Sequence, residues 1–228
     1  MGNLLIYGLA LSLLLVTSGP VSAQPKDVTA ATQQDERLRL PRQAAETGLV
    51  TMRRAAAGEG ARLLGFRSGD EPTQATLGEP FPIGVVRLDA LQAYDASRDA
   101  PPIIIDNTRM LFPVQIGSET RTGIEVIERR GKWDASAIGG SRVAYLLDSA
   151  RVAHRGAAGS AAASYFALHV PALNVYFLGV QNAGDQQLIA LSDDPRFPSL
   201  RPGAATRAAD VLAALVSAAR SIDPKQSS

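Results

Sequence analysis

The chain of 228 residues contains no cysteine. Disulfide bonds, thiol catalysis, thiolate metal sites and lipid attachment through an N-terminal cysteine are therefore excluded. Lysine is also scarce, since the 23 basic residues include only Lys26, Lys132 and Lys225 as lysines. Together with the abundance of alanine, this usage favours a bacterial source with a GC-rich genome.

An excess of either charge is absent as well, because the formal net charge is +1. No overall field then attracts nucleic acid, an anionic membrane or an acidic substrate. The pairs Arg53-Arg54 and Arg129-Arg130 have no aromatic residues interleaved with them, which is typical of solvated surface rather than of nucleic-acid contacts. With 46% hydrophobic and 20% charged residues, the composition indicates a globular protein without a nucleic-acid partner.

A long apolar run is found near the N-terminus. Residues 4–16 match the hydrophobic region of a secretory signal peptide and are shorter than the roughly 20 residues of a membrane span. The small residues at 21–23 favour cleavage after Ala23. We therefore expect residues 1–23 to be a signal peptide, and the mature chain to be periplasmic or secreted and without a membrane span. Because residues 1–3 lack Lys and Arg, an uncleaved membrane anchor or a misplaced start codon is the alternative.

The region after the expected cleavage site is polar. Residues 24–40 have no sustained apolar period and predict a flexible linker. A helix is predicted from Pro41, which suits a first turn, to about Ala57, although Gly48 weakens this prediction. Residues 41–75 are therefore interpreted as an N-terminal helical segment.

Residues 111–147 are the most informative stretch. Residues 112–116 alternate apolar and polar side chains, which indicates a strand with one buried face. The alternation continues over residues 124–127 and 133–138, after turns that contain glycine. Three strands with short connections predict an antiparallel meander in which these segments pair as neighbours.

A helix is predicted after this meander. Ser141 is suited to cap its first turn, because the hydroxyl can accept an unpaired backbone N–H. Apolar residues then recur at helical spacing over residues 141–154. Since Ala135 and Ala137 are small, we expect this helix to lie close to the sheet on the face that carries Trp133.

The second half of the chain has a similar order. An amphipathic helix over residues 204–222 follows three predicted strands, at residues 165–170, 175–180 and 188–191. Residues 81–88 are also strand-like, but Pro80 and Pro82 favour an edge strand. Residues 76–228 thus predict one α+β domain, preceded by the N-terminal helix. Its antiparallel sheet has about five to seven strands with helices packed on it, in a βββα-βββα-like order.

Histidine is nearly absent, and the two present are His154 and His169. A triad of His169 with Ser164 and Asp193 or Asp194 can be written, but no G-x-S-x-G motif supports it. His154 falls near the end of a predicted helix, and His169 alternates with Leu168 and Val170, so that it faces away from their side. We therefore expect no catalytic residue and no enzymatic activity.

Metal and phosphate motifs are also missing. Asp193-Asp194 is the one conspicuous acidic pair near a strand end, and beside Pro195 a turn explains it. Gly139-Gly140-Ser141 at a helix start can hold an anion with backbone N–H groups, with help from Arg142 and Arg129-Arg130. Two glycines are also what a tight strand-to-helix turn needs. Since neither G-x-x-x-x-G-K nor G-x-G-x-x-G follows a strand, we expect no metal ligand, no cofactor and no cofactor-binding residue.

Three functional hypotheses follow. The first is an exported, non-enzymatic binding or accessory module of the cell envelope, which uses the edge or open face of its sheet to hold an unknown partner. The second is a small-ligand binder or sensor with a pocket between helix and sheet, lined by Phe166, Tyr176 and Trp133. The third is a metal-free hydrolase that uses Ser, Asp and His. The missing catalytic machinery favours the hypotheses in this order.

Overall fold

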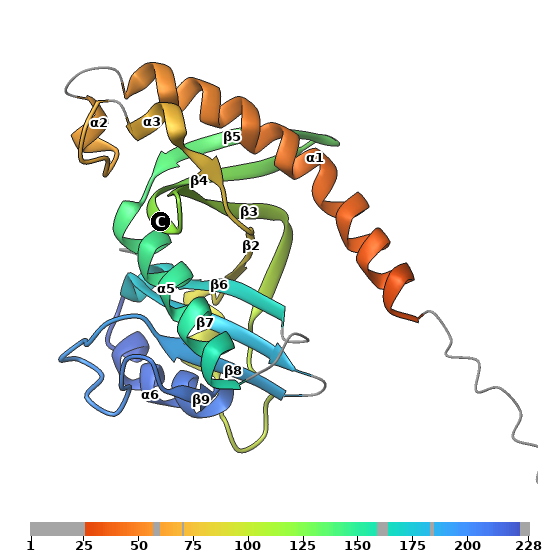
Figure 1. Ribbon diagram of the computed structural model, residues 1–228. Coiled ribbons are helices and arrows are strands. Elements are labelled where there is room, and N and C mark those ends of the chain that lie inside the picture. The colour runs from red at the N-terminus through yellow and green to blue at the C-terminus, as the bar shows by residue number, and fades with distance from the viewer. Residues whose placement is uncertain (1–25, 57–59, 70, 159–163, 183–184, 224–228) are drawn as a thin grey trace, which may run out of the picture. The chain divides into compact units, whose positions relative to one another are not determined.

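A mixed sheet of nine strands is the central element of the fold (Figure 1). The computed structural model describes residues 26–56, 60–69, 71–158, 164–182 and 185–223. The chain divides into two units, Met1–Glu36 and Arg37–Ser228, and the whole sheet belongs to the second. The expected signal peptide, residues 1–23, lies outside the described residues.

The strands follow one another in the order β5-β4-β3-β2-β6-β7-β8-β9, and the short β1 pairs with β3. Their bounds are β1 Thr76–Leu77, β2 Phe81–Val85, β3 Ile104–Ile116, β4 Glu119–Arg129, β5 Lys132–Gly139, β6 Ser164–Val170, β7 Val175–Asn182, β8 Asp185–Ala190 and β9 Ala205–Arg207. The predicted neighbours 112–116, 124–127 and 133–138 do pair in antiparallel fashion, as β3, β4 and β5. The α+β class is confirmed, but the strand count and order differ from those expected.

The parallel pairing of β2 with β6 is the main correction to the expected antiparallel sheet. It places β2 between the β3–β5 meander and the β6–β9 strands, whereas Pro80 and Pro82 favoured an edge position. Pro82 is tolerated there because pairing with β6 begins only at Ile83, and the register with β3 shifts directly after Pro82. The missing N–H of this proline therefore falls outside the regular part of the ladder.

Six α-helices and one short 3₁₀-helix are found among the described residues. Their bounds are α1 Lys26–Ala55, α2 Gly60–Leu63, α3 Glu71–Gln74, α4 Leu88–Ala93, α5 Ser141–Ala158, η1 Pro171–Leu173 and α6 Ala208–Arg220. The helix start expected at Pro41 is corrected, because α1 begins at Lys26, within the expected linker 24–40, and Pro41 lies inside the helix. Glutamine, glutamate and arginine between residues 33 and 39 favour helix locally, but they form no apolar stripe that sequence periodicity could detect.

Helices cover both faces of the sheet. One face packs against α5 through a cluster that includes Phe81, Leu147 and Leu178. The other face packs against the second half of α1 on β3 and β4, and against α4 and α6 on β6, β7 and β8. The period of two along each strand separates these layers, since Gly123 lies under α5 whereas its neighbour Ile124 lies under α1.

The helix on the Trp133 face is α1, and not the 141–154 helix as expected. Gly48 of α1 lies so close that a Cβ added there would stand 2.9 Å from Ala135 Cβ and 2.9 Å from Ile124 Cγ2. The small side chain of Ala135 does permit close packing, but of a different helix. The same Gly48 that weakened the helix prediction is therefore the residue that lets α1 approach the sheet.

Candidate functional site

A cavity of about 290 Å³ lies between the first two turns of α5 and the sheet. Its apolar wall includes Ile83, Leu111, Val143, Leu147 and Ala167, from β2, β3, α5 and β6. Four polar side chains, from β3, β4, β6 and β7, also line it, so that residues from both sides of the β2–β6 junction meet here. We call this space the α5 cavity.

Two of the polar residues form an ion pair across β3 and β4. Leu111 stands opposite Glu125 in the register, and Arg109 lies two residues before Leu111 on the same face. The Arg109 guanidinium donates to Glu125 Oε1 from Nη2 at 2.7 Å and from Nε at 3.1 Å. The two side chains are 35% and 26% exposed, so both charges are partly desolvated and remain accessible from the cavity.

The other two polar residues are His169 and Tyr176, which face each other across β6 and β7. Their rings are stacked, with centroids 4.1 Å apart and planes inclined by 4°. Burial lowers the pKa of His169, and the nearby charge of Arg109 lowers it further, against a smaller opposing effect of Glu125. Burial also raises the pKa of Tyr176, as does Glu125. Both rings are therefore neutral at pH 7.

The depressed pKa of His169 predicts that stability falls at mildly acidic pH. In the unfolded chain an imidazole titrates near about 6.5, so below that pH the unfolded state binds more protons than the folded state and the free energy of unfolding decreases. His169→Asn is expected to lose less stability than the wild type between about pH 7.5 and pH 5.5, as measured by urea unfolding. His154→Asn serves as the control, and equal losses in the wild type and His169→Asn would contradict the prediction.

Gly139 and Gly140 form the rim of the α5 cavity at the start of α5. Their φ angles are +141° and +65°, in the region that favours glycine, so the strand-to-helix turn needs both. The expected N-cap Ser141 is corrected: Gly140 precedes the helix and accepts the Ala144 N–H, whereas the Ser141 hydroxyl donates weakly to Leu64 O.

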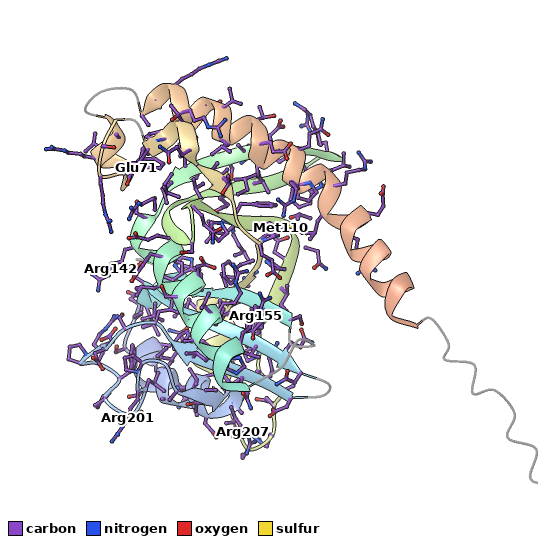
Figure 2. All side chains as sticks on the ribbon, viewed as in Figure 1. Glu71, Met110, Arg142, Arg155, Arg201 and Arg207 are labelled. Carbon is purple, nitrogen blue, oxygen red and sulfur yellow. The ribbon has the colours of Figure 1, made fainter. Side chains whose placement is uncertain are left out.

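The basic residues expected to complete an anion site are not gathered at this turn. Arg142 is exposed, and Figure 2 shows it near the start of α5, with Arg155 toward the other end. Arg129 and Arg130 lie at the opposite end of β5, more than about 20 Å away at the rise of a strand. In the other basic pair of the sequence, Arg53-Arg54, the Arg53 side chain donates to the carbonyls of Pro72 and Ala75. These arginines therefore form no common site.

The expected pocket residues are only partly brought together. Tyr176 lines the α5 cavity, but Phe166 is 2% exposed in the cluster beneath α6, on the other face of the sheet. Trp133 lines a shallow groove beside α1. Arg109 and Glu125 were missed, although one signal was present. Glu125 alternates with Ile124 and Val126, so a charged side chain lies on the sheet face that also carries Leu111 and that Val143 of α5 covers.

The structure does not assemble the conceivable triad. Ser164 and His169 lie on opposite faces of β6, five residues or about 16 Å apart. Asp194 accepts the backbone N–H and the guanidinium of Arg196, as expected of a turn. His154 Nδ1 is 3.0 Å from the Tyr165 hydroxyl. In the described part of the chain, no three His, Asp or Glu residues are placed to share a metal ion.

A buried polar network anchors α5 beside the cavity. Asp148, 8% exposed, accepts hydrogen bonds from Arg151 at 2.5 Å, Thr120 at 2.5 Å and Gln115 at 2.8 Å. Arg151, 4% exposed, also donates to the Glu79 carbonyl at 2.9 Å. Burial raises the pKa of Asp148, but the three hydrogen bonds outweigh it, so the pKa lies below its ordinary value. The network ties the helix to β3 and β4.

No family model matches the chain, and no curated protein or solved structure is detectably similar to it. Within the described residues, no helix combines the length and apolarity needed to cross a bilayer. Function is therefore inferred from the geometry of the α5 cavity, because no relative provides an activity that can be transferred.

Proposed function

We propose that the protein is a non-enzymatic binding module and that the α5 cavity holds a small molecule. The observation that carries this proposal is the convergence of Arg109, Glu125, His169 and Tyr176 beside one apolar wall. Binding sites typically combine an apolar lining with a few polar groups that orient the ligand. On the strength of the N-terminal sequence, we propose that this module is exported and acts in the cell envelope.

The polar groups of the cavity retain hydrogen-bonding capacity. Both bonds of the ion pair end on Glu125 Oε1. Among the described residues, Arg109 Nη1, Glu125 Oε2, the His169 ring nitrogens and the Tyr176 hydroxyl have no hydrogen-bond partner. A polar group that faces a cavity without a protein partner is free to bind a ligand or water.

The sheet edges offer less support for a protein partner than the sequence suggested. β5 is an outer strand of the sheet. The register shifts between Glu125 and Val126 where β4 pairs with β5, and Lys132 lies exposed at the start of β5. Bulges and lysine on an edge strand disfavour the addition of another strand. The other outer strand, β9, has three residues. We therefore rank a small ligand above a protein partner.

Blocking the cavity from its open side tests this proposal. Ala137 is exposed on β5, pairs with Glu125 and lines the cavity, so Ala137→Trp is expected to fill the space without disturbing the core. In a thermal-shift screen of metabolites, at least one compound should raise the melting temperature of the wild type and not that of Ala137→Trp. A ligand at about 100 times its dissociation constant adds about 2.7 kcal/mol to the stability.

Ser149→Trp is the matched control, because Ser149 is exposed on α5 and lines none of the cavities described above. It should respond to the same compounds as the wild type. The proposal is contradicted if no compound shifts the wild type, or if every active compound shifts Ala137→Trp equally.

A further inference from the structure

The formal charges that line the α5 cavity cancel. Arg109 contributes one positive charge and Glu125 one negative charge, while His169 and Tyr176 are neutral at pH 7. A ligand with a single charged group would meet one attractive and one repulsive partner at close range, and each charge transferred from water would need compensation. A ligand with adjacent positive and negative groups would satisfy both partners.

The geometry of the ion pair suits such a ligand. Guanidinium groups bind carboxylates through paired N–H donors, and Arg109 Nη1 has no partner among the described residues. Glu125 Oε2 is likewise without a partner there and can accept hydrogen bonds from an ammonium group. Because Arg109 and Glu125 are in direct contact at 2.7 Å, the two complementary ligand groups must also be close neighbours, as they are on the α-carbon of an amino acid.

The remaining space is apolar and small. Leu147 is fully buried, and Ala167 and Ile83 are 4% and 8% exposed. They line the cavity together with Leu111 and Val143. The whole cavity, including the part beside Arg109 and Glu125, has a volume of about 290 Å³. A branched aliphatic or a single aromatic side chain of the ligand would occupy its apolar part and bury apolar surface favourably.

We propose that the α5 cavity binds a free α-amino acid with an apolar side chain, its carboxylate on Arg109 and its ammonium group on Glu125. This proposal rests on the binding function proposed above and specifies the ligand of the same site.

Matched ligands test the proposal by isothermal titration calorimetry on the purified wild-type protein at pH 7. The probes are L-leucine, L-isoleucine and L-phenylalanine, together with 4-methylpentanoate and isoamylamine, which are leucine without its ammonium group and without its carboxylate. At least one amino acid should bind, and removal of either charged group from leucine should weaken binding about ten-fold or more.

Variants of Glu125 and Arg109 test which charged group of the ligand each side chain binds. Glu125→Gln should weaken binding of the amino acid about ten-fold or more and leave 4-methylpentanoate binding unchanged or tighter, because the repulsive carboxylate is removed. Arg109→Gln should weaken amino-acid binding and leave isoamylamine binding unchanged or tighter. Circular dichroism melts report whether each variant is folded. If a variant is not folded, the ligand series on the wild type still shows whether both charged groups of the amino acid are needed for binding.

Two outcomes would overturn the proposal without affecting the binding function. One is equal binding of leucine and 4-methylpentanoate, or of leucine and isoamylamine. The other is a screen in which compounds of another class bind, are blocked by Ala137→Trp, and no amino acid binds. If no compound at all is blocked by Ala137→Trp, both the ligand class and the proposed binding function fail.

Discussion

Asp148→Ala is expected to lower the free energy of unfolding by about 3–5 kcal/mol, because it leaves a buried charge without its partner. The Arg151 guanidinium is 4% exposed and is held by Asp148 at 2.5 Å. Among the described residues, its other close oxygen partners both belong to Glu79, whose carbonyl lies at 2.9 Å and whose carboxylate is more distant at 3.8 Å. Thr120 and Gln115 lose the same acceptor. Urea unfolding of the wild type and the variant measures the loss.

Asp134→Ala is the matched control. Asp134 also pairs with a cation, Lys132, but the two side chains are 55% and 78% exposed, so its removal should cost less than about 1 kcal/mol. Adding Arg151→Met to Asp148→Ala should recover part of the loss, since the uncompensated charge is then gone. A loss below about 1 kcal/mol for Asp148→Ala alone would show that this network does not anchor α5.

Leu215→Ala is expected to lower the free energy of unfolding by about 2–5 kcal/mol, because apolar burial is lost and a cavity remains. Leu215 is fully buried on the inner face of α6, in a cluster with Leu212, Phe166 and Leu188. A denaturant melt compares it with Ser217→Ala, an exposed position on the same helix, which should change stability by no more than about 0.5 kcal/mol. A similarly small loss for Leu215→Ala would mean that α6 is not packed as described.

Leu215 and Asp148 differ in whether their surroundings can be predicted from the sequence. Leu215 lies in the stripe of apolar residues that predicted the last helix, and burial follows from that period. Asp148 shares its helix with a comparable stripe, but nothing in the local pattern indicates that Thr120 and Gln115 lie beneath it. Polar networks depend on which side chains meet across elements, and one sequence does not contain that information.

The candidate site, too, can be predicted from the sequence only in part. The neighbourhood of Arg109 and Glu125 follows in part from the meander, since strands joined by a short turn pair in a register that the turn sets. The approach of His169 and Tyr176 does not follow, because it depends on the parallel pairing of β2 with β6, whose partners Ile83 and Ala167 are distant in the chain. Parallel strands are joined by a long crossover connection, so no short turn in the sequence indicates that they pair.

The sequence by itself determined the elements whose signals are local: the β3–β5 meander, α5, α6 and most of β6–β8. Alternation and helical period specify which side of an element is apolar. Tertiary structure alone decided which element covers which face. It placed α1 rather than α5 on the Trp133 side, joined the two halves of the sheet through β2, and left a cavity where the charges of one half meet the rings of the other. The physical reason is that an apolar face can be buried against any surface of matching shape, so the choice among surfaces depends on close packing and pairing between distant segments.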